Sequence, residues 1–129
     1  MKVIALDYGA ARTGVAVSDA TGTIARPVGV VERAGSEGGL AELGAIVREH
    51  EAERVVVGMP MTLRGERGAQ AQETDLFVDA LRAVVGIPVE TYDERFTTAI
   101  AARAGGDSDE DARAAAHLLE SYLADLARR

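Results

Sequence analysis

Residues 3–19 of the chain read VIALDYGAARTGVAVSD, and this stretch constrains the fold more than any other. The apolar run from Val3 to Leu6 predicts a buried strand, which ends at Asp7. Gly9 and Gly14 allow a sharp reversal before a second apolar strand at residues 15–17. A carboxylate at the end of a central strand costs free energy to bury unless it is paired, hydrogen-bonded or bound to a metal. The stretch therefore predicts a site that handles phosphate or metal.

The composition predicts a single compact domain over residues 1–129 with an aliphatic core. Of the 129 residues, 47% are hydrophobic and 4% are aromatic. The chain has no cysteine, which excludes disulfides, thiolate metal sites and cysteine nucleophiles and is typical of a reducing compartment. Asp7 comes too early for the apolar region of a signal peptide, and no apolar run approaches membrane-spanning length. We therefore expect a cytoplasmic protein without membrane contact.

The formal net charge is −7. Bulk attraction to nucleic acid is not expected at this charge, because such attraction depends on positive side chains that neutralise phosphates. A nucleic-acid enzyme with this balance would need bound divalent cations and a local basic patch. The charge thus disfavours a protein that coats nucleic acid more than it disfavours a metal-dependent nuclease.

The order of apolar runs predicts an α/β fold with a five-stranded mixed sheet flanked by helices. Three closely spaced strands near residues 2–7, 14–19 and 24–31 indicate an antiparallel meander, with a turn at residues 21–22. Two further strands, at 54–58 and 87–92, alternate with helices and should lie parallel to the first strand through right-handed crossovers. The expected helices run from about residue 40 to 50, around residues 76–84, briefly from residue 97, and from 108 to 128. In the second of these helices the apolar residues at helical spacing are Leu76, Phe77, Ala80, Leu81 and Val84.

Carboxylates follow strand ends that this topology brings to one edge of the sheet. Asp7 closes the first strand, and Asp93 and Glu94 close the fifth. Asp111 lies four residues before Ala115, in the first turn of the last helix, so it continues the apolar stripe that faces the sheet. In open sheets, ligands bind beyond the carboxyl ends of parallel strands. We therefore expect these four carboxylates to converge.

Three or four carboxylates without a basic partner would repel one another, and two divalent cations would relieve the repulsion. Oxygen ligands suit Mg²⁺ or Mn²⁺, and two such ions about 4 Å apart would bind a scissile phosphate, activate water and stabilise the leaving oxygen. We predict Asp7, Glu94 and Asp111 as metal ligands and Asp93 as a ligand or a support, all four being candidate catalytic residues. The sequence leaves open which of Asp93 and Glu94 points at the metal, because adjacent side chains of a strand face opposite sides.

Each carboxylate also has a purely structural explanation. Asp111 ends the segment Ser108-Asp109-Glu110-Asp111, which resembles a capping box, and taken alone this explanation is the stronger one. Asp93 and Glu94 would equally suit a solvated turn at the end of a strand. Asp7 has the weakest structural alternative, because it directly follows a buried run. The functional interpretation rests on the topology, which brings all of them to one place.

Four arginines are candidates for contact with nucleic-acid phosphates. Arg12 lies in the first glycine-bearing turn, close to Asp7. Arg64 and Arg67 lie in the polar loop of residues 59–69, where a surface loop without function explains them equally well. Arg95 follows the two carboxylates and would either pair with one of them or contact substrate, the structural role being favoured.

Five blocks of sequence match a known family. They are residues 6–9 with 12–19, residues 26–27, residues 55–60 (VVVGMP), residues 93–98 (DERFTT), and Asp111 with the apolar positions that follow it. On these blocks the chain resembles the YqgF family, also called RuvX-like Holliday-junction resolvases, within the ribonuclease-H-like fold. The resemblance covers essentially the whole chain, and the first block and the Asp-Glu-Arg block are specific when taken together.

The resemblance implies a metal-dependent phosphodiesterase, with Asp7, the pair Asp93-Glu94 and Asp111 on the acidic motifs of the family. It implies one of two substrates, branched DNA such as a Holliday junction or the 5′ end of pre-16S rRNA, and the sequence does not choose between them. A homodimer is expected for symmetric cleavage of branched DNA. Family members often carry Lys or Arg just before the last aspartate, whereas residues 105–110 here read GGDSDE. A phosphate contact expected there is therefore missing or comes from a partner subunit.

Two other classes of function stay open at this point. The segment from Asp7 to Gly14 also resembles the phosphate turn of actin-like and sugar-kinase folds, but those proteins enclose nucleotide between two lobes and this chain supplies one. A non-catalytic module that binds nucleic acid is the other alternative. The loss of an acidic motif would favour such a module, and none is lost here.

Overall fold

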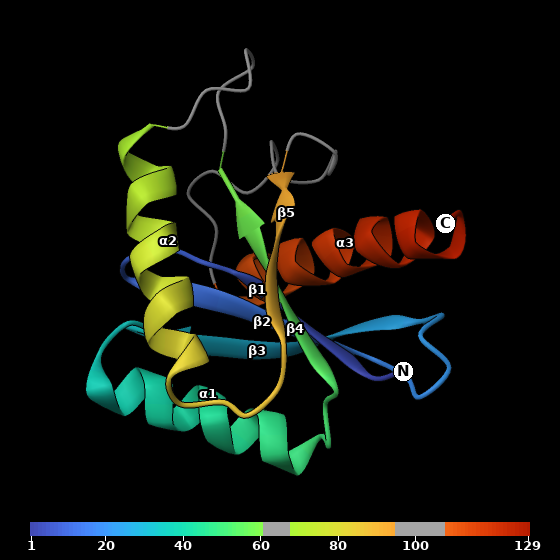
Figure 1. Cartoon of the computed structure of the whole chain (residues 1–129), viewed down its shortest axis with the longest axis horizontal. Helices are drawn as coiled ribbons and strands as arrows, with labels where there is room; N and C mark the ends of the chain where they lie inside the picture. Colours follow the sequence, from blue (N-terminus) through green and yellow to red (C-terminus); the bar gives the residue numbers. More distant parts are fainter. Residues whose placement is uncertain (61–67, 95–107) are drawn as a thin grey trace.

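A five-stranded mixed sheet lies at the centre of the protein (Figure 1). The structure is a computed structural model, and it describes residues 1–60, 68–94 and 108–129. The elements in chain order are β1 (Val3–Asp7), β2 (Arg12–Ser18), β3 (Ala25–Glu32), α1 (Glu37–Glu49), β4 (Arg54–Met59), α2 (Ala69–Arg82), β5 (Val89–Asp93) and α3 (Ser108–Ala127). The strand order is β3-β2-β1-β4-β5, antiparallel from β3 to β1 and parallel from β1 to β5. The predicted meander followed by two parallel strands is confirmed.

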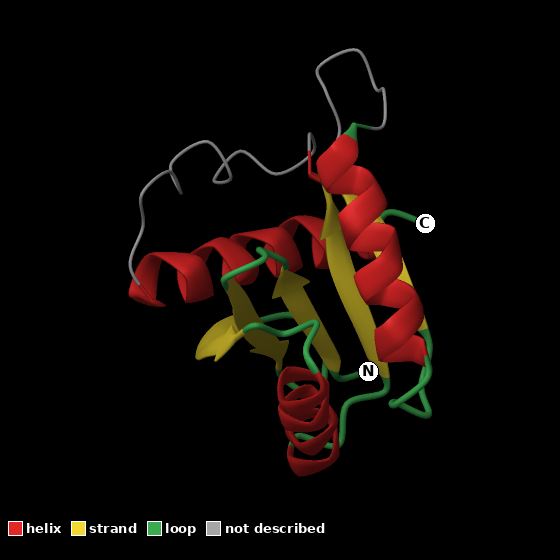
Figure 2. Ribbon diagram, turned by 90° about the vertical axis from the view of Figure 1, so that its left-hand side faces the viewer, coloured by secondary structure: helices red, strands yellow, loops and turns green. Residues whose placement is uncertain are grey.

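Helices cover both faces of the sheet, with α1 and α2 on one face and α3 on the other (Figures 1 and 2). Successive side chains of a strand point to opposite faces. In β1, Ile4 and Leu6 join the core beneath α1 and α2, whereas Val3 and Ala5 join the core beneath α3. The same alternation directs Asp7, two residues after Ala5, to the face that α3 covers.

The apolar stripe predicted for the last helix forms the α3 side of the core. Leu118, Leu119 and Tyr122 of α3 are at most 1% exposed and pack against Val56 and the other small strand residues on that face. His117 lies off this stripe, and its side chain is half exposed. α3 is 20 residues long and carries charged side chains, and within the described ranges no helix has the length and apolar character needed to cross a bilayer.

The buried face of α2 differs from the prediction at two positions. Leu76 is 71% exposed, and Val84 lies beyond the end of the helix and is 47% exposed. The buried residues of α2 are Ala71, Thr74, Phe77, Val78 and Leu81. The ring of Phe77 stacks on Tyr8 at 4.3 Å between centroids, so this contact with the β1–β2 connection sets the rotation of the helix and leaves Leu76 in solvent. The short helix predicted from residue 97 lies outside the described residues.

The second half of the first sequence block has a structural role in the turn between β2 and β3. The carboxylate of Asp19 accepts hydrogen bonds from the backbone N–H groups of Thr23 and Ile24 and from the hydroxyl of Thr21. These bonds hold the pKa of Asp19 well below its usual range. Ser18 is buried and accepts a bond from the Val3 N–H, which ties the start of β1 to the end of β2. This part of the block therefore closes the meander and adds no group to the carboxylate edge.

We expect Leu81→Ala and Leu76→Ala to have very different effects on stability, although both change one leucine of α2. Leu81 is fully buried, so its truncation leaves a cavity and should cost about 2–5 kcal/mol. Leu76 is mostly in solvent, so its truncation should change the free energy of unfolding by less than about 0.5 kcal/mol. Urea denaturation followed by circular dichroism measures both values. Equal losses for the two variants would contradict this orientation of α2.

Candidate functional site

Asp7 is a buried carboxylate at the carboxyl end of β1. It is 2% exposed and pairs in register with Gly14 of the neighbouring antiparallel strand. Leu6, the residue before it, pairs with Val57 of β4. The end of β1 therefore lies between β2, which is antiparallel to it, and β4, which is parallel to it. Burial of a charged carboxylate is costly without compensation, and this position therefore needs a cation or hydrogen-bond donors close by.

Glu94 reaches the same face of the sheet because β4 has a glycine where the side chain passes. Glu94 directly follows β5 and is 8% exposed. A Cβ atom on Gly58 would lie 2.8 Å from Glu94 Oε1 and 3.2 Å from a methyl carbon of Leu118 in α3. The carboxylate thus extends back over β4, the strand next to β1, on the side that α3 covers. A side chain at position 58 would therefore displace Glu94.

Asp111 is positioned by direct packing of α3 on β2. A Cβ atom on Gly14 would lie 1.9 Å from the backbone oxygen of Asp111, so only glycine permits the contact. Because Gly14 is the register partner of Asp7, the first turn of α3 is brought over the end of β1. Asp7, Glu94 and the first turn of α3 therefore come from three separate elements on the face of the sheet that α3 covers.

Arg12 is the cation that the structure shows at Asp111. Its Nε lies 3.0 Å from Asp111 Oδ2, in an ion pair without the angles of a hydrogen bond. The Arg12 side chain is 41% exposed and that of Asp111 is 13% exposed. Arg12 therefore lies beside the first turn of α3 and forms an ion pair with the carboxylate of that helix.

Asp93 and Glu94 are separated by the alternation of the strand. Asp93 ends β5 opposite Met59 of β4, and Tyr92, the residue before it, belongs to the core beneath α3. Asp93 consequently points toward the α1–α2 side, while Glu94 returns to the α3 side. Glu94 thus lies on the face of the sheet that α3 covers, the same face to which the alternation of β1 directs Asp7, and Asp93 is on the opposite face.

The donor set suits a hard divalent cation, since Asp7, Glu94 and Asp111 offer carboxylate oxygens alone. Two of the three are almost fully buried, and glycines at positions 14 and 58 leave room around them. In the side-chain arrangement of the described residues, no three His, Cys, Asp or Glu groups stand close enough together to hold an ion. The three residues thus fit Mg²⁺ or Mn²⁺ by their ligand chemistry and by the strand and helix ends that carry them. The Asp111 side chain is paired with Arg12.

Sequence reasoning missed a small pocket beside Glu94. It has a volume of about 110 Å³ and lies between the β1–β2 connection and the first turns of α2, where Tyr8, Gln70 and Glu73 line it. Burial, with a smaller contribution from the negative charge of Glu73, raises the pKa of the Tyr8 phenol. Tyr8 stands next to Asp7 in the sequence, but the residues of α2 that complete the pocket carry no motif. Only the packing of Phe77 on Tyr8 brings them together.

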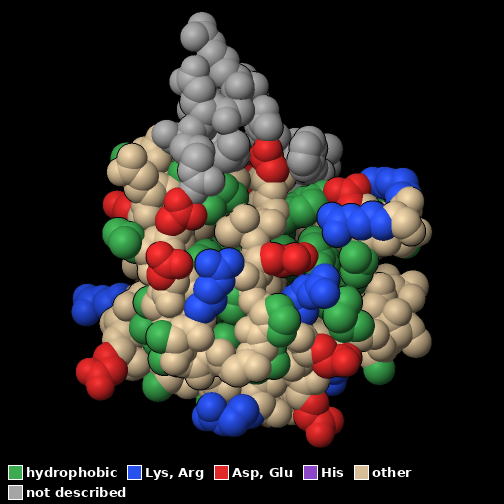
Figure 3. Space-filling view, in the orientation of Figure 1, with side chains coloured by type: hydrophobic (Ala, Val, Ile, Leu, Met, Phe, Trp, Pro, Cys, Tyr) green, Lys and Arg blue, Asp and Glu red, His purple; other side chains and the backbone are tan. Residues whose placement is uncertain are grey.

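Three of the four predicted phosphate contacts lie outside the described residues, namely Arg64, Arg67 and Arg95. On the face seen in Figure 3, acidic and basic side chains of the described residues alternate, and no basic stripe crosses it. Of the predicted phosphate contacts, Arg12 is therefore the one that the structure places at the site.

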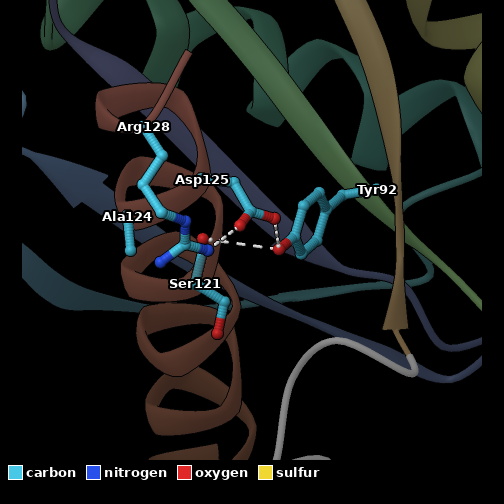
Figure 4. A pocket seen from close by; sticks show the side chains of 5 residues that line it. All are labelled: Tyr92, Ser121, Ala124, Asp125 and Arg128. Atoms are coloured by element: carbon cyan, nitrogen blue, oxygen red, sulfur yellow. Dashed lines mark hydrogen bonds and ion pairs between the residues drawn. The ribbon is translucent and has the colours of Figure 1, made fainter.

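A larger pocket lies at the other end of α3, against β5 (Figure 4). It has a volume of about 470 Å³ and is lined by Tyr92, by α3 residues that include Asp125, and by Arg128 just beyond the end of the helix. The Tyr92 hydroxyl donates to the Asp125 carboxylate, which also pairs with Arg128. Burial and the bond to Asp125 raise the pKa of Tyr92 to about 12, and the same bond lowers the pKa of Asp125. This network joins α3 to the sheet and includes none of the predicted site residues.

The sheet order and the carboxylates at its edge define a protein of the ribonuclease-H-like fold. The structure is similar to that of T. thermophilus RuvC in complex with Holliday junction substrate, with a TM-score of 0.61, 19% sequence identity, and coverage of 98% of this chain and 96% of that chain. At this identity the likeness shows the fold. A ROK hexokinase from Thermus thermophilus shares the fold over 83% of this chain and 38% of its own, with a TM-score of 0.50 and 24% identity.

The chain belongs to the RuvX family, whose model, described as Holliday junction resolvase, matches residues 1–125. A relative in Rhodococcus opacus (strain B4), named "Putative pre-16S rRNA nuclease", is 41% identical in an alignment that covers 97% of this chain and 78% of the relative. A relative of the same name in Chloroflexus aurantiacus is 43% identical over 99 residues, 77% of this chain. That match spans 65% of the Chloroflexus protein. The family resemblance inferred from the sequence blocks is thus confirmed.

We expect Gly14→Ala to destabilise the protein strongly and Gly38→Ala to leave it as stable or slightly more stable. An added Cβ at position 14 meets the backbone of α3 at 1.9 Å, so the helix must move, at a cost of about 3 kcal/mol or more. A Cβ at position 38, on α1, meets nothing within 4 Å, and alanine favours the helix by about 0.5–1 kcal/mol. Thermal unfolding measures both effects, and a Gly14→Ala protein as stable as the wild type would contradict the packing of α3 on β2.

We expect the Tyr92 phenol to titrate near pH 12 in the folded protein. Its folded pKa lies above the ordinary value of 10, so its contribution to stability is complete below pH 10 and is lost as the pH rises from about 10 to 12. Absorbance at 295 nm should show a tyrosine titrating in this range, and Tyr92→Phe should remove that component. Asp125→Asn should shift it part of the way toward 10, because burial remains after the hydrogen bond to a carboxylate is lost. A Tyr92→Phe curve unchanged in this range would contradict the assignment.

Proposed function

We propose that this protein is a divalent-metal-dependent endonuclease that hydrolyses phosphodiester bonds in structured nucleic acid. The observation that carries the proposal is the placement of buried Asp7 and Glu94 and of the first turn of α3, which carries Asp111, on one face at the carboxyl edge of the sheet. Membership of the RuvX family and the nuclease names of the relatives support the same activity. The substrate is branched DNA, such as a Holliday junction, or the 5′ end of pre-16S rRNA.

In this proposal Asp7, Glu94 and Asp111 hold the metal. One or two divalent cations, when bound, neutralise the carboxylates and stabilise the charge that develops on the phosphate. The burial of Asp7 and Glu94 restricts their side chains, so that little reorganisation is needed to present their oxygens. Arg12, Arg64, Arg67 and Arg95 are the proposed phosphate contacts. Asp93 has a supporting role, since its side chain lies on the face of β5 opposite to that of Glu94.

The proposed partners are nucleic acid and a second copy of the chain. A four-way junction is two-fold symmetric, so paired cuts call for two sites related by the same symmetry. The formal net charge of −7 makes a bound cation the natural counterion between this edge and a phosphate backbone.

We expect Asp7→Asn to reduce cleavage at least about 100-fold, because the amide retains the shape of the side chain but loses the charge that binds a cation. The assay uses a labelled Holliday junction, a linear duplex of the same sequence and a pre-16S rRNA leader, each with Mg²⁺, Mn²⁺ or EDTA. Asp79→Asn is the matched control, because Asp79 lies on α2 with its side chain 72% exposed, and its rate should stay within about twofold of the wild type.

The preferred substrate in this assay distinguishes junction resolution from rRNA maturation. Cleavage that persists in EDTA, or an Asp7→Asn protein as active as the wild type, would refute the metal-dependent mechanism. Binding without cleavage by the folded protein would favour a non-catalytic module instead, and hydrolysis of ATP without cleavage would favour a phosphate-binding lobe.

A further inference from the structure

The ion pair between Arg12 and Asp111 joins the start of β2 to the first turn of α3. The two side chains are not equivalent. Asp111 is largely enclosed, at 13% exposure, whereas Arg12 is 41% exposed and so retains access to water. The guanidinium can therefore leave the pair at a small cost in solvation, while the Asp111 carboxylate stays largely enclosed.

The backbone of Asp111 is held independently of this ion pair. The contact of its carbonyl oxygen with Gly14 locates the first turn of α3, and the buried stripe of the helix secures the rest. Arg12 lies two residues before Gly14 on the same strand face. Asp111 can therefore exchange one cationic partner for another without a shift of α3.

A guanidinium and a divalent cation would compete for the same atom. Arg12 Nε lies 3.0 Å from Asp111 Oδ2, and Mg²⁺ binds carboxylate oxygens at about 2.0–2.1 Å. Two cations on one oxygen would stand within a few ångströms of each other in an enclosed position, where water and salt screen their repulsion poorly. With the pair formed, no three His, Cys, Asp or Glu side chains of the described residues are close enough together to share an ion.

We propose that Arg12 is a built-in competitor of the metal: it neutralises Asp111 when no divalent cation is present and must leave before one binds there. The proposal rests on the proposed function, because the competing cation is the metal of the nuclease site. Arg12 thereby sets the metal concentration at which Asp111 joins Asp7 and Glu94. It acts through Asp111, so its role in metal binding is that of a positioning residue.

The test is the affinity of the full chain for Mn²⁺, measured by isothermal titration calorimetry without nucleic acid. Arg12→Gln should bind Mn²⁺ at least about fivefold more tightly than the wild type, because an ion pair no longer has to be broken. Arg113→Gln is the matched control. It removes the same charge from an exposed position two residues from Asp111, and its affinity should stay within about twofold of the wild type. Arg12→Lys should restore an affinity close to that of the wild type.

Two further variants separate competition from a purely structural ion pair. Asp111→Asn should weaken Mn²⁺ binding, and adding Arg12→Gln to it should produce no tightening, because the contested carboxylate is gone. A structural ion pair would lower the melting temperature of Arg12→Gln and leave its metal affinity unchanged or weaker. That outcome, or equal tightening by Arg113→Gln, would overturn the proposal.

Failure of the proposed function would look different. If neither the wild type nor Arg12→Gln binds Mn²⁺ at millimolar concentration while both are folded, the metal site itself is refuted, and the competition with it. If the wild type binds Mn²⁺ through Asp111 and Arg12→Gln binds it no better, the metal site stands and only the competition is refuted.

Discussion

The contact between Gly14 and the first turn of α3 is the constraint on which the rest of this structure depends. No side chain separates the helix backbone from the strand there, since a Cβ would lie 1.9 Å from the carbonyl oxygen of Asp111. From this contact α3 extends across the sheet, and its apolar stripe closes the second core. The same contact brings a carboxylate of the last helix to the strand pair that holds Asp7.

Gly58 applies the same principle on the other side of β1. In each case a strand residue without a side chain leaves space on the face that α3 covers, and an acidic residue distant in the sequence enters that space. At Gly14 the incoming group is helix backbone, and at Gly58 it is the flexible end of Glu94. Gly14 therefore allows the close packing of a helix, whereas Gly58 allows the placement of a side chain.

In the proposed function, the charges at this edge explain how an acidic protein of the RuvX family would approach nucleic acid. With a net charge of −7 the chain has no general attraction for phosphate, so its contacts must be local. Arg12, a proposed phosphate contact, forms an ion pair with Asp111. In the proposed mechanism, bound cations replace the Arg12 guanidinium as the positive partner of Asp111. The large pocket at the far end of α3 has no part in this exchange.

Much of the fold followed from local patterns in the sequence. The apolar runs and turns predicted the meander, the parallel strands and the stripe of α3, because alternation and helical periodicity depend on neighbouring residues alone. The same patterns placed Asp7 at a strand end and Asp111 in the first turn of a helix. They failed for Leu76, since the rotation of α2 is set by the packing of Phe77 on Tyr8 from another part of the chain.

The sequence by itself therefore determined the elements, their order and the acidic residues at their ends. Only the tertiary structure decided that Glu94 lies on the face that α3 covers, which residues complete the pocket at Tyr8, and that Asp111 pairs with Arg12. The physical reason is range. A strand or helix end is encoded in a few adjacent residues, whereas the face a carboxylate reaches depends on register and on glycines in other strands, through contacts that no local pattern contains.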